Sequence, residues 1–68
     1  MKPGDIFVVP EEPSPENDVA NGMYPVYGVI IYVDEYDDPE TSVFSAEGKL
    51  LQDFWYFHRD EIQILEEA

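Results

Sequence analysis

Hydrophobic residues occur along this chain in short runs that are separated by proline, glycine and acidic residues. Six prolines and four glycines divide the 68 residues, and the runs between them are rich in Val, Ile, Tyr and Phe. Short runs of β-branched and aromatic residues between turn-forming residues are typical of β-strands. No run repeats its apolar residues with helical spacing. The pattern therefore predicts a mainly β protein.

Five strands are expected from these runs. The first covers residues 5–9 and precedes a long polar loop that contains four prolines before residue 26. The second, residues 26–33, has one face formed by Val26, Gly28, Ile30 and Tyr32 and an equally apolar opposite face, so it is expected to be central or to meet a partner. The other strands are expected at residues 41–46, 49–57 and 62–65, with a bulge near residues 52–53. Glu47-Gly48 predicts a tight hairpin, and residues 58–61 predict one helical turn.

The length of 68 residues is enough for one domain, residues 1–68. The chain has no cysteine, so disulfides cannot compensate for a small core. Dense packing or a partner is then expected to stabilise the fold, and a homodimer is one open alternative.

The order of these elements resembles the SH3-like small barrel. The most similar part is residues 55–64, WYFHRDEIQI, which resembles the strand, helical turn and closing strand of that fold. The resemblance implies a five-stranded antiparallel barrel with one short helical turn near the C-terminus. It implies no site, because this barrel serves many unrelated functions.

Charge is the most unusual property of the sequence. Sixteen Asp and Glu residues stand against three Lys and Arg residues, which gives a formal net charge of -13. Nucleic-acid and anionic-membrane binding both depend on cationic residues, so direct binding of either is not expected. The longest apolar run, residues 29–33, is too short to span a bilayer, and a cytoplasmic location is expected.

The candidate chemistry of the chain is poor in catalytic and metal-ligating patterns. No serine has the glycine-flanked elbow of a nucleophile, so no enzymatic activity and no cofactor are expected. His58 beside Glu61 would suit acid and base work, but no nucleophile accompanies them. The acidic run of residues 34–40 offers oxygen ligands for calcium as a weaker alternative, because it lacks the EF-hand pattern. We therefore expect no metal.

The acidic residues are the leading candidates for a binding site. Carboxylates on strands and loops can present an array of negative charge to a basic protein surface, in the place of phosphates. In size, acidity and aromatic content the chain is similar to small bacteriophage inhibitors that act as DNA mimics on proteins of a bacterial host. We expect a basic, nucleic-acid-binding protein as the partner, bound by three acidic segments with one tyrosine and the tryptophan: Glu11, Glu12, Glu16, Asp18, Asp34, Glu35, Asp37, Asp38, Glu40, Asp60, Glu61, Tyr36 and Trp55.

A second hypothesis gives the binding role to aromatic residues. In this reading Tyr36, Phe54, Trp55 and Tyr56 hold a protein partner or form part of an accessory subunit, and the acids serve solubility. The run from Phe54 to Phe57 places two aromatics on each face of its strand, and one pair is expected in the core. Dependence of binding on salt distinguishes the two hypotheses.

Overall fold

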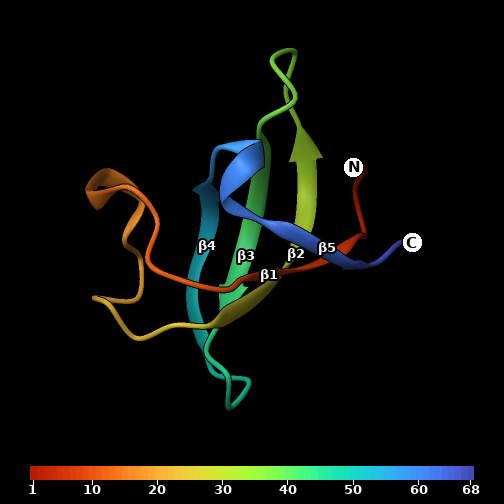
Figure 1. The fold of residues 1–68 in the computed structure, drawn as a ribbon. Helices are drawn as coiled ribbons and strands as arrows, with labels where there is room; N and C mark the ends of the chain where they lie inside the picture. Colours follow the sequence, from red (N-terminus) through yellow and green to blue (C-terminus); the bar gives the residue numbers. More distant parts are fainter.

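The computed structural model describes residues 1–68 and contains one antiparallel sheet of five strands (Figure 1). The strands are β1 (Ile6–Val9), β2 (Val26–Val33), β3 (Pro39–Phe44), β4 (Leu50–Tyr56) and β5 (Gln63–Glu66). The helical segments are two 3-10 turns, η1 (Pro15–Asn17) and η2 (Arg59–Glu61). The prediction of a mainly β protein with a helical turn before the last strand is confirmed. No helix has the length and the apolar character needed to cross a membrane.

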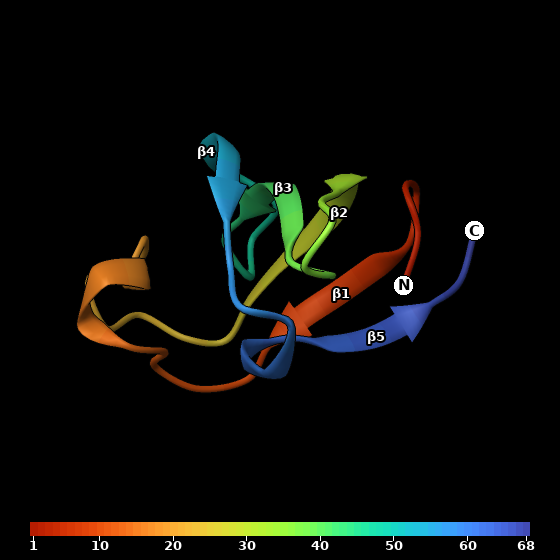
Figure 2. The same ribbon diagram turned by 90° about the horizontal axis from the view of Figure 1, so that it is seen from above.

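The sheet is strongly curved but does not close into a barrel. Its strand order is β4-β3-β2-β1-β5, and this order with η2 between β4 and β5 agrees with the SH3-like resemblance. A closed barrel would need hydrogen bonds between the two edge strands. β5 is only four residues long and pairs with β1 alone, and the chain from β4 turns through η2 before it reaches β5. β4 and β5 therefore point apart at the two edges (Figure 2), and the prediction of closure is wrong.

The hairpin between β3 and β4 is wider than the sequence predicts. β3 starts at Pro39 and ends at Phe44, and β4 starts only at Leu50. Two backbone hydrogen bonds form the turn, from Gly48 N to Ser45 O at 2.9 Å and from Ser45 N to Lys49 O at 2.8 Å. Gly48 has φ +88°, which is the conformation expected of glycine in this turn. Its place in the turn is confirmed, whereas the predicted ends of the two strands are wrong by one to two residues.

Irregular pairing in the sheet changes which side chains face the core. The register of β2 against β3 shifts between Ile30 and Tyr32, so that Tyr32 pairs with Glu40. The shift turns Tyr32 away from the core, and its predicted place on the face of Ile30 is therefore wrong. In β4 the predicted bulge is confirmed, because two residues, Asp53 and Phe54, stand opposite Ser42.

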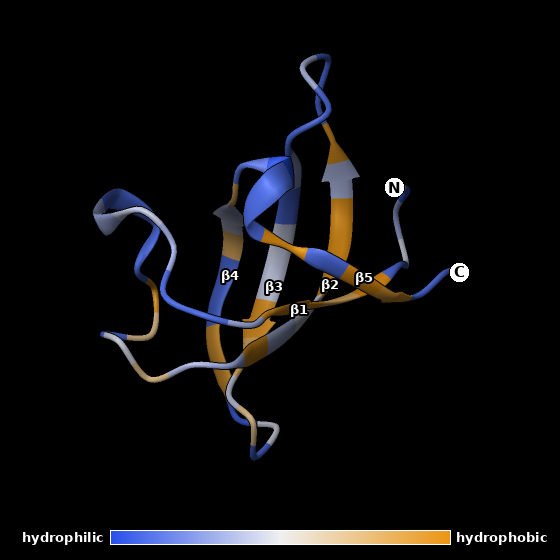
Figure 3. Ribbon diagram, viewed as in Figure 1, coloured by the Kyte–Doolittle hydropathy of each residue, from blue (hydrophilic) through white to orange (hydrophobic).

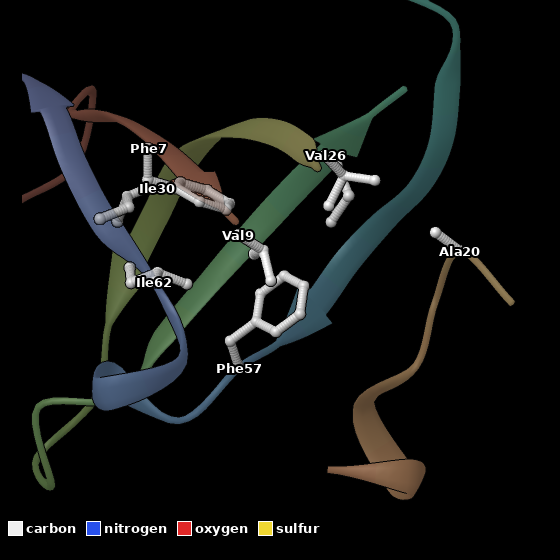
Figure 4. Packing of buried hydrophobic residues seen from close by; sticks show 8 residues of the cluster. Phe7, Val9, Ala20, Val26, Ile30, Phe57 and Ile62 are labelled. Atoms are coloured by element: carbon white, nitrogen blue, oxygen red, sulfur yellow. The ribbon is translucent and has the colours of Figure 1, made fainter. Parts of the chain in front are cut away.

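The core lies in the concave side of the curved sheet (Figure 4). Its fully buried apolar side chains come from β1, β2, β3 and the segment after β4 and are Phe7, Val9, Val26, Ile30, Val43 and Phe57. The rings of Phe7 and Phe57 meet edge to face, with centroids 6.0 Å apart. Gly28 allows this packing, because the Phe7 ring lies against its Cα where a Cβ would otherwise stand.

Asp5 is a buried carboxylate that holds the two ends of the chain together. It is 1% exposed and accepts hydrogen bonds from the backbone N–H of Lys2 at 2.9 Å and of Ala68 at 2.8 Å. The hydrogen bond from Ala68 is the main cause that lowers the pKa of Asp5, and Lys2 lowers it further. The charge of Asp5 thus stabilises the fold, although the sequence marks it only as the first residue of a strand.

Candidate functional site: an acidic end around the second 3-10 turn

Three acidic segments that are far apart in the sequence meet around η2. They are residues 11–18, residues 34–38 and residues 60–61, and they contain ten of the sixteen acidic residues of the chain. Hydropathy colouring shows the first loop around η1, the loop between β2 and β3, and η2 as mainly hydrophilic (Figure 3).

Glu61 joins the long first loop to η2. Its carboxylate accepts hydrogen bonds from the backbone N–H of Ser14 at 3.0 Å, the Ser14 hydroxyl at 2.9 Å and the Asn17 amide at 2.7 Å. It also accepts the backbone N–H of His58 at 2.8 Å. Partial burial raises the pKa of Glu61, but the hydrogen bonds from His58, Ser14 and Asn17 outweigh burial and lower the pKa overall. Glu61 is therefore ionised, and both of its carboxylate oxygens accept hydrogen bonds from other groups of the protein.

Arg59 joins the loop between β2 and β3 to η2. Its backbone N–H donates to the Asp38 carboxylate at 3.2 Å, and its guanidinium lies 3.8 Å from the Asp37 carboxylate. Both Arg59 and Asp37 are exposed, so the ion pair itself adds little stability. Together the hydrogen bond and the ion pair mark where the acidic loop lies next to η2.

The loop between β2 and β3 is shaped by one of its own carboxylates. Asp34 accepts the backbone N–H groups of Tyr36 and Asp38, both at 2.9 Å, which forms an Asx-type turn. Asp37 takes φ +64°, a conformation that Asp and Asn tolerate better than most residues. Glu35 and Tyr36 are left at the exposed tip of the loop, where Tyr36 is 72% exposed.

A small hollow lies between the first loop and η2. Its volume is about 220 Å³, and it is lined by Pro10, Glu11, Glu12, Asp60, Glu61 and Gln63. Four of these six residues are acidic and none is basic. The hollow therefore favours a cationic group over any anion.

Few positive charges offset this concentration of acids. Arg59 pairs with Asp37, and His58 lies 3.9 Å from Glu16. Lys2 is at the other end of the structure beside Asp5 and Glu67, and Lys49 lies in the hairpin between β3 and β4. We call the exposed and half-exposed carboxylates around η2 the acidic end: Glu11, Glu12, Glu16, Glu35, Asp37, Asp38 and Asp60.

The remaining predicted site residues lie elsewhere or have internal partners. Asp18 accepts the backbone N–H of Gly22 at 2.9 Å and the Tyr24 hydroxyl at 2.8 Å, and these bonds lower its pKa. Burial, followed by the bond to Asp18, raises the pKa of Tyr24 to about 12. Trp55 faces inward and packs against the core, with no hydrogen-bond acceptor in the chain for its buried Nε1. Glu40 lies on the outer face of β3, beyond the acidic end.

Sequence reasoning missed the neighbours of Glu40. Tyr32 of β2 and Tyr56 of β4 stand directly opposite Glu40 on its two sides, and both tyrosines are exposed. Strict alternation along β2 places Tyr32 on the inner face, so only the register shift at Ile31 reveals this arrangement. No short motif in the sequence signals it.

Comparisons with models of protein families, with curated protein sequences and with solved structures gave no match to this chain. In the structure no three Asp, Glu or His side chains come together in a group that could hold a metal ion. The acidic loop of residues 34–38 instead uses the carboxylates of Asp34 and Asp38 to accept backbone hydrogen bonds.

Proposed function

We propose that this protein is a non-enzymatic binding protein whose acidic end occupies the basic, nucleic-acid-binding surface of a partner protein. The observation that carries the proposal is the meeting of three separate acidic segments at η2, with Arg59 and His58 as the only basic side chains among them. A cationic surface that binds phosphates would be attracted to this end and would be blocked by it.

The available side chains also favour binding over catalysis. Ser14 donates its hydroxyl to Glu61, and His58 lies beside Glu16, so this end of the fold contains no serine and histidine pair. In the proposal the protein is a DNA-mimic inhibitor of the kind that bacteriophages make, and it acts in the cytoplasm of a bacterial host. The partner, and not this chain, contacts nucleic acid.

A capture experiment tests the proposal. The immobilised protein is exposed to a lysate of the source host at low salt, and bound proteins are released either with salt or with duplex DNA. We expect DNA to release a basic nucleic-acid-binding protein, and we expect its affinity to fall steeply with salt, since exposed charges interact over a Debye length of about 10 Å at 0.1 M. Binding that is indifferent to both DNA and salt would exclude the proposal.

A pair of charge-matched variants makes this test specific. Asp34, Asp37 and Asp38 are changed together to Asn, which keeps the carbonyl acceptors of the turn and suits the φ of residue 37. The control changes Glu47, Glu66 and Glu67 together to Gln, so both variants lose three charges from -13. We expect the first variant to associate about 10-fold more slowly, with little change in dissociation, and the control to remain near wild type. Equal loss in both would show that only net charge matters.

A second function is favoured by the exposed aromatic residues of β4. Phe54 is 69% exposed and Tyr56 is 45% exposed, which suits a protein-interaction module that uses an apolar face. This function requires binding that persists at high salt and is lost when Phe54 is changed to Ser. The capture experiment at two salt concentrations therefore distinguishes the two functions.

A further inference from the structure

A row of three side chains crosses the outer face of the sheet beside the acidic end. Tyr32 of β2 pairs with Glu40 of β3, and Glu40 pairs with Tyr56 of β4. Directly opposed residues of antiparallel strands project from the same face, so the two tyrosines flank the carboxylate. Tyr32 is 55% exposed and Tyr56 is 45% exposed, while Glu40 is partly covered between them. We call Tyr32, Glu40 and Tyr56 the tyrosine–glutamate row.

The charge of Glu40 has no partner within the protein. Its side chain makes no salt bridge or hydrogen bond, whereas Lys2 contacts Asp5 and Arg59 contacts Asp37. The surroundings of the row are negative, because burial and then the charges of Glu40 and Asp34 raise the pKa of Tyr56. A partly covered carboxylate between two exposed aromatic rings is suited to a cationic ligand.

We propose that the tyrosine–glutamate row binds an arginine side chain of the partner, with the guanidinium on Glu40 and the two tyrosine rings along its sides. The proposal rests on the proposed function, since it takes the partner to be a basic protein. Tyr32 and Tyr56 are two strands apart, about 9.5 Å between backbones, which leaves room for a flat group between the rings. Arginine fits better than lysine because its guanidinium is planar, less strongly hydrated, able to stack on aromatic rings and able to bind a carboxylate through two hydrogen bonds.

Charge complementarity also decides against a second copy of the chain on this face. Two copies related by a two-fold axis would bring Glu40 and its acidic surroundings against themselves, and each copy has a net charge of -13. A partner with arginine supplies the missing cation. It would extend the contact from the acidic end across the loop of residues 34–38 and onto the sheet.

NMR titration of the intact protein tests this site with a simple probe. The probe is N-acetyl-arginine methylamide, added at low salt, and the backbone amide shifts are followed across the protein. We expect saturable shifts at the tyrosine–glutamate row with a dissociation constant on the order of 1 mM. The citrulline analogue, which has the same shape and no charge, should bind at least roughly 10-fold more weakly, and the lysine analogue should also be weaker.

Variants separate a specific site from general attraction to a negative protein. Glu40→Gln should weaken arginine binding at least roughly 10-fold, whereas Glu47→Gln, which removes the same charge from the exposed turn between β3 and β4, should leave it unchanged. The double change of Tyr32 and Tyr56 to Leu should also weaken binding, with the rest of the amide spectrum preserved. Shifts that spread over all acidic loops, or equal losses for Glu40→Gln and Glu47→Gln, would overturn the proposal, as would the absence of saturation at the row.

The two proposals fail in different ways. If the arginine probe does not bind at the row but DNA still displaces the captured partner, only the arginine site is wrong. If the probe binds at the row but nucleic acid never competes with the partner, the proposed function is wrong and the row remains an arginine site.

Discussion

Gly28 is the position where a single methyl group should damage this fold most. It lies in the middle of β2 and pairs with Phe7 of β1 and Val43 of β3. A Cβ at this position would overlap with Phe7 Cζ and with the Ser42 carbonyl oxygen, and would lie 2.7 Å from Phe7 Cε2. The Phe7 ring is fully buried and the Ser42 oxygen belongs to the backbone of β3, so neither can move without disturbing the core or the sheet.

We expect Gly28→Ala to lower the free energy of unfolding by about 3 kcal/mol. An extra methyl group in a tightly packed core usually costs about 1–3 kcal/mol, and here it meets a backbone atom as well as a ring. The gain of about 0.4–1 kcal/mol from a less flexible unfolded chain offsets only part of this cost. A domain of this size has a free energy of unfolding of about 3–10 kcal/mol. The variant should therefore be largely unfolded if the wild type lies at the low end of this range, and much less stable than the wild type otherwise.

Urea unfolding followed by the fluorescence of Trp55 measures this loss, because Trp55 is the single tryptophan and packs against the core. A slope of about 1 kcal/mol per M predicts that the midpoint falls by about 3 M. Gly48→Ala is the control, since a Cβ there meets nothing within 4 Å and only its φ of +88° opposes the change, at about 1–2 kcal/mol. If Gly28→Ala unfolds within about 0.5 M of wild type, the tight contact with Phe7 does not exist.

Three further predictions concern opposite faces of β2 and two hydrogen-bonded side chains. In urea unfolding, Ile30→Ala should lower the free energy of unfolding by about 2–5 kcal/mol and Tyr32→Ala by less than about 1 kcal/mol, since Ile30 is buried and Tyr32 is exposed. Similar losses in the two variants would instead place Ile30 and Tyr32 on the same face of β2. Glu61→Gln should cost about 1–3 kcal/mol near pH 7. Because the folded-state pKa of Glu61 is below its ordinary 4.5, this stabilisation is complete above pH 4.5 and is lost as the pH falls through the folded value, so the acid unfolding curves of wild type and variant should converge. Tyr24 should ionise at about pH 12 in an ultraviolet titration. Because its pKa is raised in the folded state, the stabilisation by Tyr24 is complete below pH 10 and is lost as the pH rises toward 12. If all tyrosines ionise at their ordinary pH, and Tyr24→Phe has no group with a raised pKa to remove, the hydrogen bond to Asp18 is contradicted.

The sequence predicted the strands well because local chemistry determines them. Prolines and glycines limit the apolar runs, and the positive φ of Gly48 fixes the turn between β3 and β4. The ends of β3 differ from the prediction because pairing with β2 starts at Pro39, where β-propensity alone gives no signal. The sequence could not show that the sheet stays open, because closure depends on long-range pairing of β5 that no short segment encodes.

The candidate site was predictable in composition but not in arrangement. The sequence identified the three acidic segments, because each is a local run of carboxylates. It could not reveal that Glu61 accepts a hydrogen bond from Ser14, 47 residues away in the sequence. This contact occupies the Glu61 carboxylate inside the protein, so Glu61 is not one of the carboxylates free to meet a partner. Nor could the sequence reveal the tyrosine–glutamate row, which depends on the register shift of one residue at Ile31.

The clustering of the acids favours the proposed recognition of a basic partner over a role in solubility alone. A net charge of -13 keeps a small protein soluble wherever the carboxylates lie, and an even distribution would reduce their mutual repulsion. Here the protein instead uses Glu61 and Arg59 to bring three acidic segments together, so that repulsion between them opposes folding. Solubility does not require this arrangement, whereas the proposed binding of a basic surface would benefit from it, because the attraction grows with the local density of charge. We therefore expect the triple Asn variant of Asp34, Asp37 and Asp38 to unfold at equal or higher urea concentration than wild type while its partner binding declines.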